Sequence, residues 1–346
     1  MADFGERGMR RRRFFAWGLG VAACAAGCGA ERTGTDHAGP GHPDAGHAGG
    51  DGAGRGAGGQ GGGARARFSI VAGGPRWART GRAFASAARA AGFPPGGSVI
   101  TVTGLAALAA AELNNGQSLL DTGTPLARLS GEVEVVVVPE RSPLRDFDDF
   151  GDRLLASPGQ TLLAGGPQGE PGHLLFGLIA RALGADGRQV DYTGYRGSGE
   201  AVAALMAGKA VAAAGPLSQW RAGLGRGRIR ALAVSSARRV PGLDVPTLLE
   251  CGVRVDFADW AAAFGPERMS AESREAAVRM CDEVIGSGAW EAACRVAGWL
   301  PLPLAGDDFA NWLSTEIART QAVLRDLGLL DSTKATTCWG SCGNGH

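Results

Sequence analysis

From Thr124 to Leu330 the sequence alternates short apolar runs with longer amphipathic segments, and small residues stand where the amphipathic segments begin. Short apolar runs bounded by turn residues are typical of buried strands. Apolar residues at helical spacing are typical of helices that pack on a sheet. Strands and helices in regular alternation predict the α/β class with doubly wound sheets, and no other feature of the sequence restricts the fold as strongly.

The same alternation begins upstream, at about residue 68, so the predicted elements cover most of the chain. The apolar run at 133–138 is interrupted only by Glu134, which indicates a strand buried on both faces of a largely parallel sheet. The predicted strands are 68–72, 99–102, 133–138, 161–164, 190–192, 210–214 and 229–234. The predicted helices are 80–91, 105–113, 172–183, 199–207, 290–297 and 308–327.

One more helix is predicted to begin at Ser142-Pro143. Serine is a favoured N-cap residue, and proline is favoured at the first helical position because its missing N–H needs no partner there. The apolar face of this helix is expected to contain Leu144, Phe147, Phe150 and Leu154.

Composition restricts the partners. The chain has 346 residues, of which 45% are hydrophobic, and a formal net charge of +1. This length can bury one sizeable core or two lobes that share a hinge. A nearly neutral chain lacks the basic surface that nucleic acid attracts, so we expect no nucleic-acid partner.

Motifs of catalysis are absent from the sequence. It contains no Gly-x-Ser-x-Gly turn, no His-Glu-x-x-His helix and no Gly-Lys-Ser/Thr phosphate loop. His173 is the only histidine within the predicted α/β region, so a serine or cysteine nucleophile has one candidate base at most. We therefore expect no enzyme activity, no catalytic residues, no cofactor and no metal site.

The first residues have the layout of an export signal. Arg10–Arg13 form a positive segment, and Phe14–Ala23 form an apolar segment too short to span a bilayer as a mature helix. Cys24 and Cys28 both follow sequences like the lipobox of bacterial lipoproteins, with Cys28 preferred. We expect residues 1–28 to export the chain, by the twin-arginine route as one option, and a lipid to hold it on the outer face of the cytoplasmic membrane. A plain signal with incidental cysteines is the alternative.

Residues 29–66 differ from both neighbouring regions. They are dominated by Gly and Ala and contain almost no apolar side chain large enough to pack, so they predict a flexible linker. His37, His42 and His47 recur regularly in it. We expect these histidines to be solvated, with weak metal capture as the alternative.

Two pairs of cysteines are candidates for disulfide bonds. Residues 331–346 predict a flexible tail, and Cys338 and Cys342 are close enough in sequence for a small disulfide loop outside the membrane. Cys281 and Cys294 fall on neighbouring predicted helices, and the sequence leaves open whether they form a bridge.

Six short sequences stand in a characteristic order along more than half of the chain. They are Thr124-Pro-Leu-Ala-Arg-Leu129, Val135-Val-Val-Val-Pro139 followed by Ser142-Pro143, Pro171-Gly-His-Leu-Leu175, Tyr195-Arg-Gly-Ser-Gly199, Arg230-Ala-Leu-Ala-Val-Ser235 and Leu243-Asp-Val-Pro-Thr-Leu248. In this order they resemble the extracytoplasmic solute receptors of tripartite tricarboxylate transporters, the tctC or Bug family, in a form like actinobacterial lipoproteins.

The resemblance implies a two-lobe, type II periplasmic-binding-protein fold. Its doubly wound sheets are joined by two crossover strands, which would be 133–138 and about 257–265. Lobe one would then comprise 67–138 with 257–330, and lobe two 139–256. The helices after Ser270 would pack back on lobe one.

The family's function is implied in the same way. A receptor of this family is expected to capture a small organic anion, such as a di- or tricarboxylate, and to present it to the membrane subunits of a tripartite transporter. The family also implies a monomer. Ligands of doubly wound sheets gather at the carboxyl ends of strands, where helices begin and offer free N–H groups.

The turns of lobe two that match the family give the candidate contacts Gly166, His173, Tyr195, Gly197, Ser198 and Ser218. In lobe one the candidates are Gly73, Gly74 and Arg76, in a loop that does not match the family. Each of these residues also has a purely structural interpretation, which stays open. The glycines would serve turn geometry and the serines would cap helices. The histidine would make a structural hydrogen bond, the tyrosine would pack, and the arginine would be a solvated surface residue.

Lobe one departs from the family's pattern. Its first loop reads Gly73-Gly-Pro-Arg-Trp-Ala-Arg79, and between Glu112 and Thr124 the chain lacks room for a strand and loop that the family usually has. Arg76 or Arg79 is a candidate substitute for the lost backbone contacts, because a guanidinium binds a carboxylate with two parallel donors. The alternative hypothesis is a degenerate paralogue that acts as a surface interaction or signalling protein without capturing solute.

Overall fold

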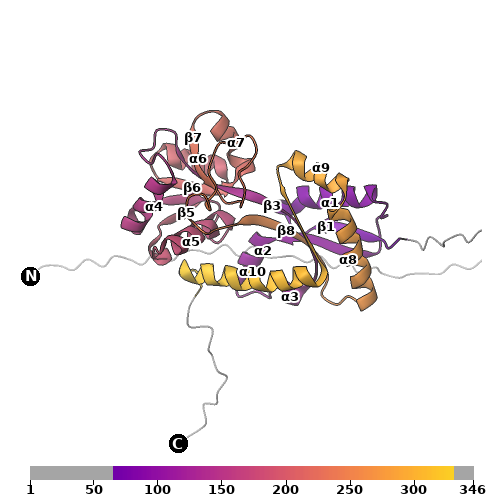
Figure 1. Ribbon diagram of the computed structural model, residues 1–346. Coiled ribbons are helices and arrows are strands. Elements are labelled where there is room, and N and C mark those ends of the chain that lie inside the picture. The colour runs from indigo at the N-terminus through magenta and orange to yellow at the C-terminus, as the bar shows by residue number, and fades with distance from the viewer. Residues whose placement is uncertain (1–64, 331–346) are drawn as a thin grey trace, which may run out of the picture. The chain divides into compact units, whose positions relative to one another are not determined.

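The computed structural model describes residues 65–330, and Figure 1 shows how their helices and strands are arranged. The strands are β1 (Phe68–Ala72), β2 (Ser98–Gly104), β3 (Gly123–Pro139), β4 (Leu163–Gly165), β5 (Tyr192–Gly194), β6 (Ala212–Pro216), β7 (Ile229–Val234), β8 (Ala258–Pro266) and β9 (Leu300–Ala305). The α-helices are α1 (Ala78–Ala90), α2 (Leu105–Leu113), α3 (Leu119–Thr122), α4 (Phe147–Ala156), α5 (Pro171–Leu183), α6 (Ser198–Met206), α7 (Leu217–Gly225), α8 (Ala271–Ile285), α9 (Gly288–Ala297) and α10 (Gly306–Asp326). Short 3-10 helices are η1 (Pro75–Trp77), η2 (Pro158–Gln160) and η3 (Gly187–Gln189). This order confirms the predicted α/β class.

The long strand β3 belongs to two sheets. Its first part, 123–133, pairs with β8, which pairs with β2 and through it with β1. Its last part, 134–139, pairs with β6 and β7, and β6 continues to β4 and β5. We call the part built on β1, β2, β8 and β9 lobe one, and the part built on β4 to β7 lobe two.

Strand β8 is the second connection between the lobes. The backbone N–H of Phe257 donates to the carbonyl of Ser235 in lobe two at 2.9 Å, and the chain then enters the sheet of lobe one. Figure 1 shows β3 and β8 side by side between the lobes. This arrangement confirms the prediction of two lobes joined by two crossover strands.

The prediction of a largely parallel sheet around residues 133–138 is wrong. Only β1–β2, β4–β5 and β4–β6 pair in parallel within the described residues, and β3 is antiparallel to β6, β7, β8 and β9. Burial on both faces was predicted correctly, because Val135 to Val138 are all fully buried. An apolar run indicates burial, whereas the direction of pairing depends on the route of the whole chain.

Buried side chains hold the helices on the sheets. In lobe one, α1, α8 and α9 share a core in which the Phe84 ring meets the Trp290 ring edge-on, with 5.5 Å between centroids. In lobe two, α6 and α7 cover one face of the sheet with Leu205 and Trp220. Each large apolar side chain that becomes fully buried contributes about 1.5–3 kcal/mol to folding.

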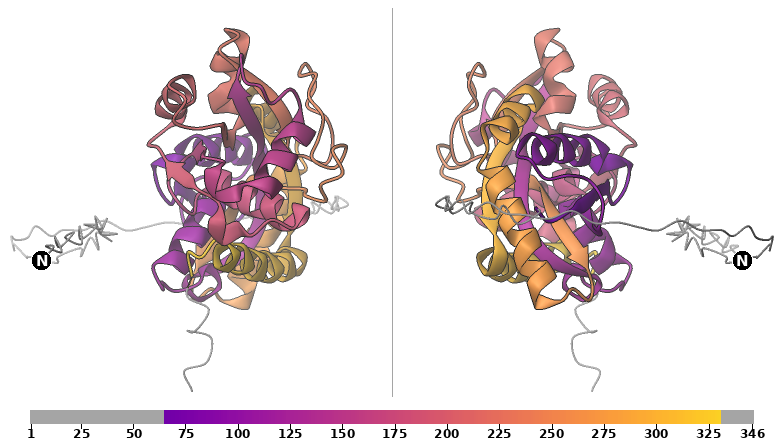
Figure 2. Two further views of the ribbon diagram at one scale, coloured as in Figure 1. Left: turned by 90° about the vertical axis from the view of Figure 1, so that its left-hand side faces the viewer. Right: turned by 90° about the vertical axis from the view of Figure 1, so that its right-hand side faces the viewer.

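Helix α10 packs across both lobes. Phe309 and Val323 belong to a core that also contains residues of α2 in lobe one and of α4 and α5 in lobe two. Gly177 of α5 permits the close approach, because a Cβ there would lie 2.8 Å from Val323 Cγ1. Figure 2 shows α10 along one edge of the molecule. The expected packing of this helix on lobe one is therefore incomplete, since α10 also holds lobe two.

The helix predicted to begin at Ser142 begins later. Helix α4 starts at Phe147, and Asp146 is its N-cap, accepting from the Asp149 N–H. The Ser142 hydroxyl caps only a turn, where it accepts from the Leu144 N–H at 3.2 Å. The Arg230 guanidinium donates to the carbonyls of Ser142, Leu144 and Arg145, which keeps these acceptors out of a helix. The predicted apolar face is confirmed, because Leu144, Phe147, Phe150 and Leu154 are buried.

Several elements have no counterpart in the sequence prediction. Helix α3, begun by a Ser118 capping box, fills the segment where a family strand lacks room and leads directly into β3. Strand β9 was also missed. Strand β9 contains prolines at alternate positions and pairs with β3 at the edge of its sheet, where a missing N–H is tolerated.

Cys281 and Cys294 are free buried thiols, so no bridge joins α8 and α9. None of the helices in residues 65–330 is long and apolar enough to cross a membrane. Outside the described residues lie the predictions for the export signal with Cys24 and Cys28, for the linker histidines, and for the tail with Cys338 and Cys342.

Candidate functional site

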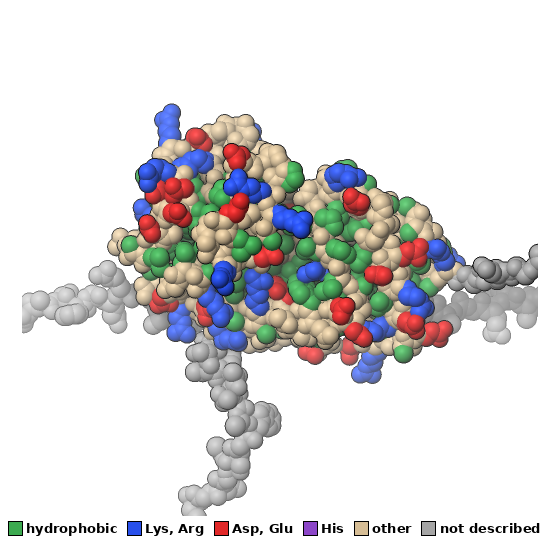
Figure 3. Space-filling view, in the orientation of Figure 1, with side chains coloured by type: hydrophobic (Ala, Val, Ile, Leu, Met, Phe, Trp, Pro, Cys, Tyr) green, Lys and Arg blue, Asp and Glu red, His purple; other side chains and the backbone are tan. Residues whose placement is uncertain are grey.

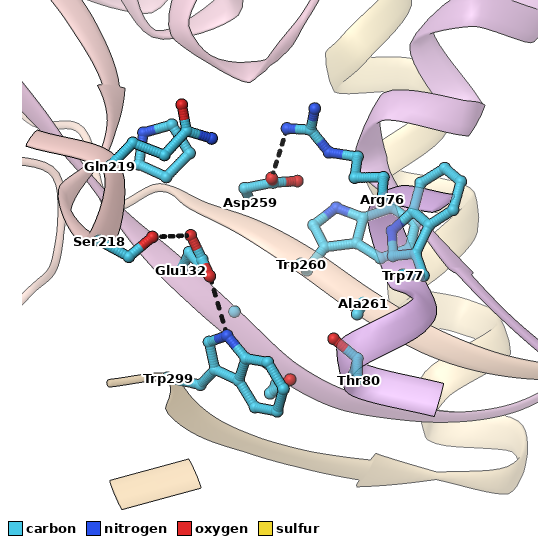
Figure 4. A pocket seen from close by; sticks show the side chains of 13 residues that line it. Arg76, Trp77, Thr80, Glu132, Ser218, Gln219, Asp259, Trp260, Ala261 and Trp299 are labelled. Atoms are coloured by element: carbon cyan, nitrogen blue, oxygen red, sulfur yellow. Dashed lines mark hydrogen bonds and ion pairs between the residues drawn. The ribbon is translucent and has the colours of Figure 1, made fainter. Parts of the chain in front are cut away.

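A cavity of about 250 Å³ lies between the two lobes. Figure 3 shows the surface notched there, and Figure 4 shows the side chains that line the cavity. The lining residues come from lobe one, from lobe two and from both crossover strands: Arg76, Trp77, Thr80, Ser130, Gly131, Glu132, Pro216, Ser218, Gln219, Asp259, Trp260, Ala261 and Trp299. A molecule bound in this cavity would touch both lobes at once.

Two helix beginnings meet at the cavity. Arg76 and Trp77 lie in η1, directly after β1, and lead into α1. Ser218 and Gln219 lie in the first turn of α7, directly after β6, and this helix has no side-chain cap. The first N–H groups of a helix lack intrahelical acceptors and carry a partial positive charge, so the start of α7 offers donors to an anion.

Glu132 ties the two lobes together from the floor of the cavity. One of its carboxylate oxygens accepts a hydrogen bond from the Ser218 hydroxyl of lobe two at 2.9 Å. The other accepts from the Trp299 indole N–H of lobe one at 2.8 Å. Figure 4 shows this chain of contacts along β3.

Arg76 makes the second contact across the lobes. Its guanidinium donates to Asp259 Oδ2 on β8 at 2.8 Å and to Glu170 Oε2, at the start of α5 in lobe two, at 3.1 Å. The Arg76 side chain is 30% exposed and the Asp259 side chain 10% exposed. Burial raises the pKa of Asp259 above its usual value in spite of the neighbouring Arg76 charge. Asp259 Oδ1 is buried and has no hydrogen-bond partner among the described residues.

A further carboxyl group, that of Glu134 on β3, is subject to the charges of Asp259 and Arg76. The Glu134 side chain is fully buried, and neither of its oxygens has a hydrogen-bond partner in the described part of the chain. Burial, followed by the charge of Asp259, raises its pKa well above the usual value. Glu134 is therefore held in its neutral, protonated form over a wider pH range than an ordinary glutamate.

Of the nine predicted contacts, the cavity brings together Arg76 and Ser218. One backbone group of each neighbouring glycine makes a hydrogen bond within the protein. The N–H of Gly73 donates to the Val102 carbonyl at 2.8 Å, and the Gly74 carbonyl accepts from the Trp77 N–H.

The other predicted contacts of lobe two lie outside the cavity. The Gly166 carbonyl accepts from the Tyr192 hydroxyl at 2.7 Å. His173 is 3% exposed, stacks on the Tyr192 ring with 3.9 Å between centroids, and accepts from the Gly169 N–H through Nδ1. Burial lowers the pKa of His173 to about 4. Three predicted contacts of lobe two remain. Tyr195 packs on the core of lobe two, Gly197 is the N-cap of α6, and Ser198 is the first residue of α6.

Sequence reasoning missed Glu132, Asp259, Trp260 and Trp299. The available signal was a set of carboxylates at the entry to the apolar crossover strands, in Glu132-Val-Glu134 and in Asp259-Trp260. Charged residues are rare in such strands unless they have a partner or a function. The pairing of β3 with β8, which brings the carboxylates together, is not visible in the sequence.

A two-lobed fold with a polar cavity between its lobes defines the class of periplasmic-type solute-binding proteins. Residues 102–328 match the family described as the tripartite tricarboxylate transporter family receptor, TctC. The chain therefore belongs to this family, as its motifs predicted.

Two relatives support this assignment. The chain is 26% identical to Protein BugT of Bordetella pertussis over 212 residues, which are 61% of this chain and 64% of BugT. It is 31% identical over 153 residues to the UPF0065 protein in the tcbD-tcbE intergenic region of a Pseudomonas species, covering 41% of this chain and 45% of that protein. The matches thus span less than two thirds of either relative.

Solved structures share the fold. A TctC solute-binding protein from Polaromonas superimposes with a TM-score of 0.61 at 18% identity, covering 75% of this chain and 99% of that one. MatC from Rhodopseudomonas palustris, with bound malate, superimposes with a TM-score of 0.57 at 18% identity, covering 74% of this chain and 99% of MatC. Rpa4515 from the same organism, with adipate, superimposes with a TM-score of 0.57 at 21% identity, covering 75% of this chain and 97% of Rpa4515. The predicted periplasmic-binding-protein fold is confirmed, and the alternative of a degenerate paralogue is not favoured.

Proposed function

We propose that the chain is an extracytoplasmic receptor that captures a small organic acid between its lobes and presents it to the membrane subunits of a tripartite transporter. The observation that carries the proposal is the cavity lined by residues of both lobes, in a chain that belongs to the receptor family. The malate and adipate bound to relatives of the same fold make di-acids the first compounds to test.

The mechanism is a population shift. Strands β3 and β8 form the connection about which the lobes move, and a ligand that contacts both lobes stabilises the closed form by its differential affinity for the two forms. Arg76 and Ser218 contact partners across the cleft, so the lobes have polar links of their own. The membrane subunits would recognise the closed receptor.

The proposed carboxylate contacts are Arg76 and the first turn of α7 with Ser218. Helix beginnings bind anions through free N–H groups, and a guanidinium adds paired donors. The other candidates, Gly73, Gly74, Gly166, His173, Tyr195, Gly197 and Ser198, stay predictions for a rearranged form of the cleft.

The proposed receptor also has an expected location and oligomeric state. We infer a receptor without catalytic activity that acts as a monomer, with lobes divided at about residues 138 and 256. A lipid on Cys28, or on Cys24, would hold it on the outer face of the cytoplasmic membrane after export, with the twin-arginine route as one option. Labelling of cells with a radioactive fatty acid, for the native chain and for Cys28→Ala, tests the anchor.

Titration calorimetry of the full chain with malate, adipate, succinate and citrate tests the receptor function. A receptor gains about 2.7 kcal/mol of stability at a hundredfold excess of ligand over its dissociation constant, so thermal unfolding provides an independent readout. Saturable binding with a matching rise in unfolding temperature would support the proposal. A cooperatively folded chain that binds none of these acids and none of the compounds in the panel below would contradict it.

A further inference from the structure

We propose that the solute of this cleft carries a positively charged nitrogen, held between Glu132 and Asp259, in addition to its carboxylate. This inference rests on the proposed receptor function and names the chemistry of the ligand. It predicts a zwitterion, and not a simple di-acid, as the preferred compound.

The first observation is an acceptor without a donor. Asp259 lines the cavity with a side chain that is 10% exposed, and its Oδ1 atom has no partner among residues 65–330. A buried acceptor without a hydrogen bond costs about 1–3 kcal/mol. A ligand N–H group that reaches Oδ1 would remove this cost, and a ligand carboxylate would not.

The second observation is the charge of the cavity wall. Glu132 and Asp259 both line the cavity, and Arg76 is the only basic residue among the lining residues of the described chain. The Arg76 guanidinium is already shared between Asp259 and Glu170. A dicarboxylate would therefore add two negative charges to a site whose one positive charge is already paired, whereas a cationic nitrogen would balance the surplus.

The third observation is the aromatic lining. Trp77, Trp260 and Trp299 all line the cavity, and Figure 4 shows Trp77 and Trp260 beside Arg76 and Asp259. Indole faces attract cations within about 6 Å. Trp299 already holds one, because the Arg79 guanidinium lies 5.2 Å from its ring centroid. Carboxylates and indole faces together form a suitable environment for an ammonium group.

An organic cation fits this wall better than a metal ion. Within residues 65–330 no three His, Cys, Asp or Glu side chains are grouped so that they could hold a metal ion. Metal ions also gain nothing from the apolar edges of three indoles, whereas an alkylated nitrogen buries its methylene or methyl groups there. The first turn of α7, with Ser218 and Gln219, is left for the ligand's carboxylate.

The test uses ligands that differ in one end group. Glutarate, δ-aminovalerate and cadaverine share one chain length and carry two carboxylates, one of each group, or two ammonium groups. Glycine betaine and tert-butylacetate have the same shape and differ only in the charge of the central nitrogen or carbon. We expect titration of the full chain to show at least about tenfold tighter binding for the zwitterionic member of one series. For δ-aminovalerate this is the effect of one charge-assisted hydrogen bond, whereas glycine betaine has no N–H and gains only from the opposite charges and the indole faces.

A charge variant separates recognition from general binding. Glu132→Gln keeps the acceptor for Trp299 and removes the charge, so it should weaken the zwitterion about tenfold and leave the matched anion as tight or tighter. Glu291→Gln on α9 is the control, because this side chain is 68% exposed and is not among the residues that line the cavity. Affinities of the control should equal those of the native chain.

The first two outcomes distinguish failure of the cationic site from failure of acid capture. Preference for glutarate and tert-butylacetate, with no loss in Glu132→Gln, would overturn the cationic site and leave the receptor function standing. Binding of cadaverine without δ-aminovalerate, glycine betaine or any organic acid would support the cationic site and contradict capture of an acid. Absence of binding by all compounds, including malate and adipate, would contradict both.

Discussion

Glu132 on β3 lies directly opposite Asp259 on β8 in the antiparallel pair that joins the lobes. Side chains at such positions stand about 5 Å apart, and like charges there repel each other. Ser218, Trp299 and Arg76 compensate for the repulsion by donating to the two carboxylates. Two carboxylates therefore lie close together on the floor of the cleft, at the point where the lobes meet.

Replacing Arg76 with Ala should destabilise the chain. The change leaves the buried Asp259 carboxylate without its ion pair, and breaking a partly buried pair costs about 1–3 kcal/mol. Urea unfolding of the full chain measures the loss. The double variant Arg76→Ala with Asp259→Asn should recover a large part of it, and equal losses in the single and double variants would show that the pair contributes nothing.

Replacing Glu134 with Gln should raise stability increasingly as the pH rises. The folded-state pKa of Glu134 is raised, so the native chain keeps its full stability below the unfolded pKa and loses stability as the pH rises toward the folded pKa. Glutamine does not ionise and avoids this loss. Unfolding free energies of both chains at pH 5 and pH 8 measure the effect, and a gain no larger at the higher pH would contradict the buried neutral carboxyl.

Replacing His173 with Gln tests a group whose contribution to stability is lost as the pH falls, opposite to Glu134. Burial lowers the folded-state pKa of His173 to about 4, so its contribution is present above the unfolded value and is lost as the pH falls toward 4. The native chain should lose on the order of 3 kcal/mol from this group between pH 7 and pH 4. The variant lacks the stacking on Tyr192 and starts less stable at pH 7. Its difference from the native chain should shrink toward pH 4, and a constant difference would exclude titration of His173.

Replacing Gly172 with Ala should disturb the start of α5. A Cβ at this position would lie 2.7 Å from the Ala214 carbonyl oxygen of β6, which is backbone and has little freedom to move. Strain of this kind typically costs about 1–3 kcal/mol. Thermal unfolding of the full chain measures the loss. Gly199→Ala is the matched control, because nothing lies within 4 Å of a Cβ there.

Local sequence predicted most elements because their signals are local. The strand at Phe68–Ala72, the strand at Ile229–Val234 and the helix at Leu105–Leu113 have the predicted bounds. Helix α4 was placed too early because Arg230, distant in sequence, takes the carbonyls before Phe147. A capping signal is local, whereas the competing hydrogen bonds come from another strand.

The candidate site was predicted less completely than the fold. Turn sequences led to Arg76 and Ser218, since glycines and serines at helix beginnings are visible in the sequence. Glu132 and Asp259 are separated by more than a hundred residues and meet only through the register of β3 and β8. His173 stands at a helix beginning with a polar side chain, as a contact residue would, but its burial against Tyr192 gives it a structural role.

The sequence by itself determined the α/β class, the alternation of helices and strands, and the family, because each of these follows from the order and spacing of neighbouring residues. Tertiary structure decided the antiparallel pairing of β3, the packing of α10 on both lobes and the acidic floor of the cleft. These features depend on which distant segments lie side by side. Desolvation and charge at Glu134 and Asp259 arise only when those segments have met.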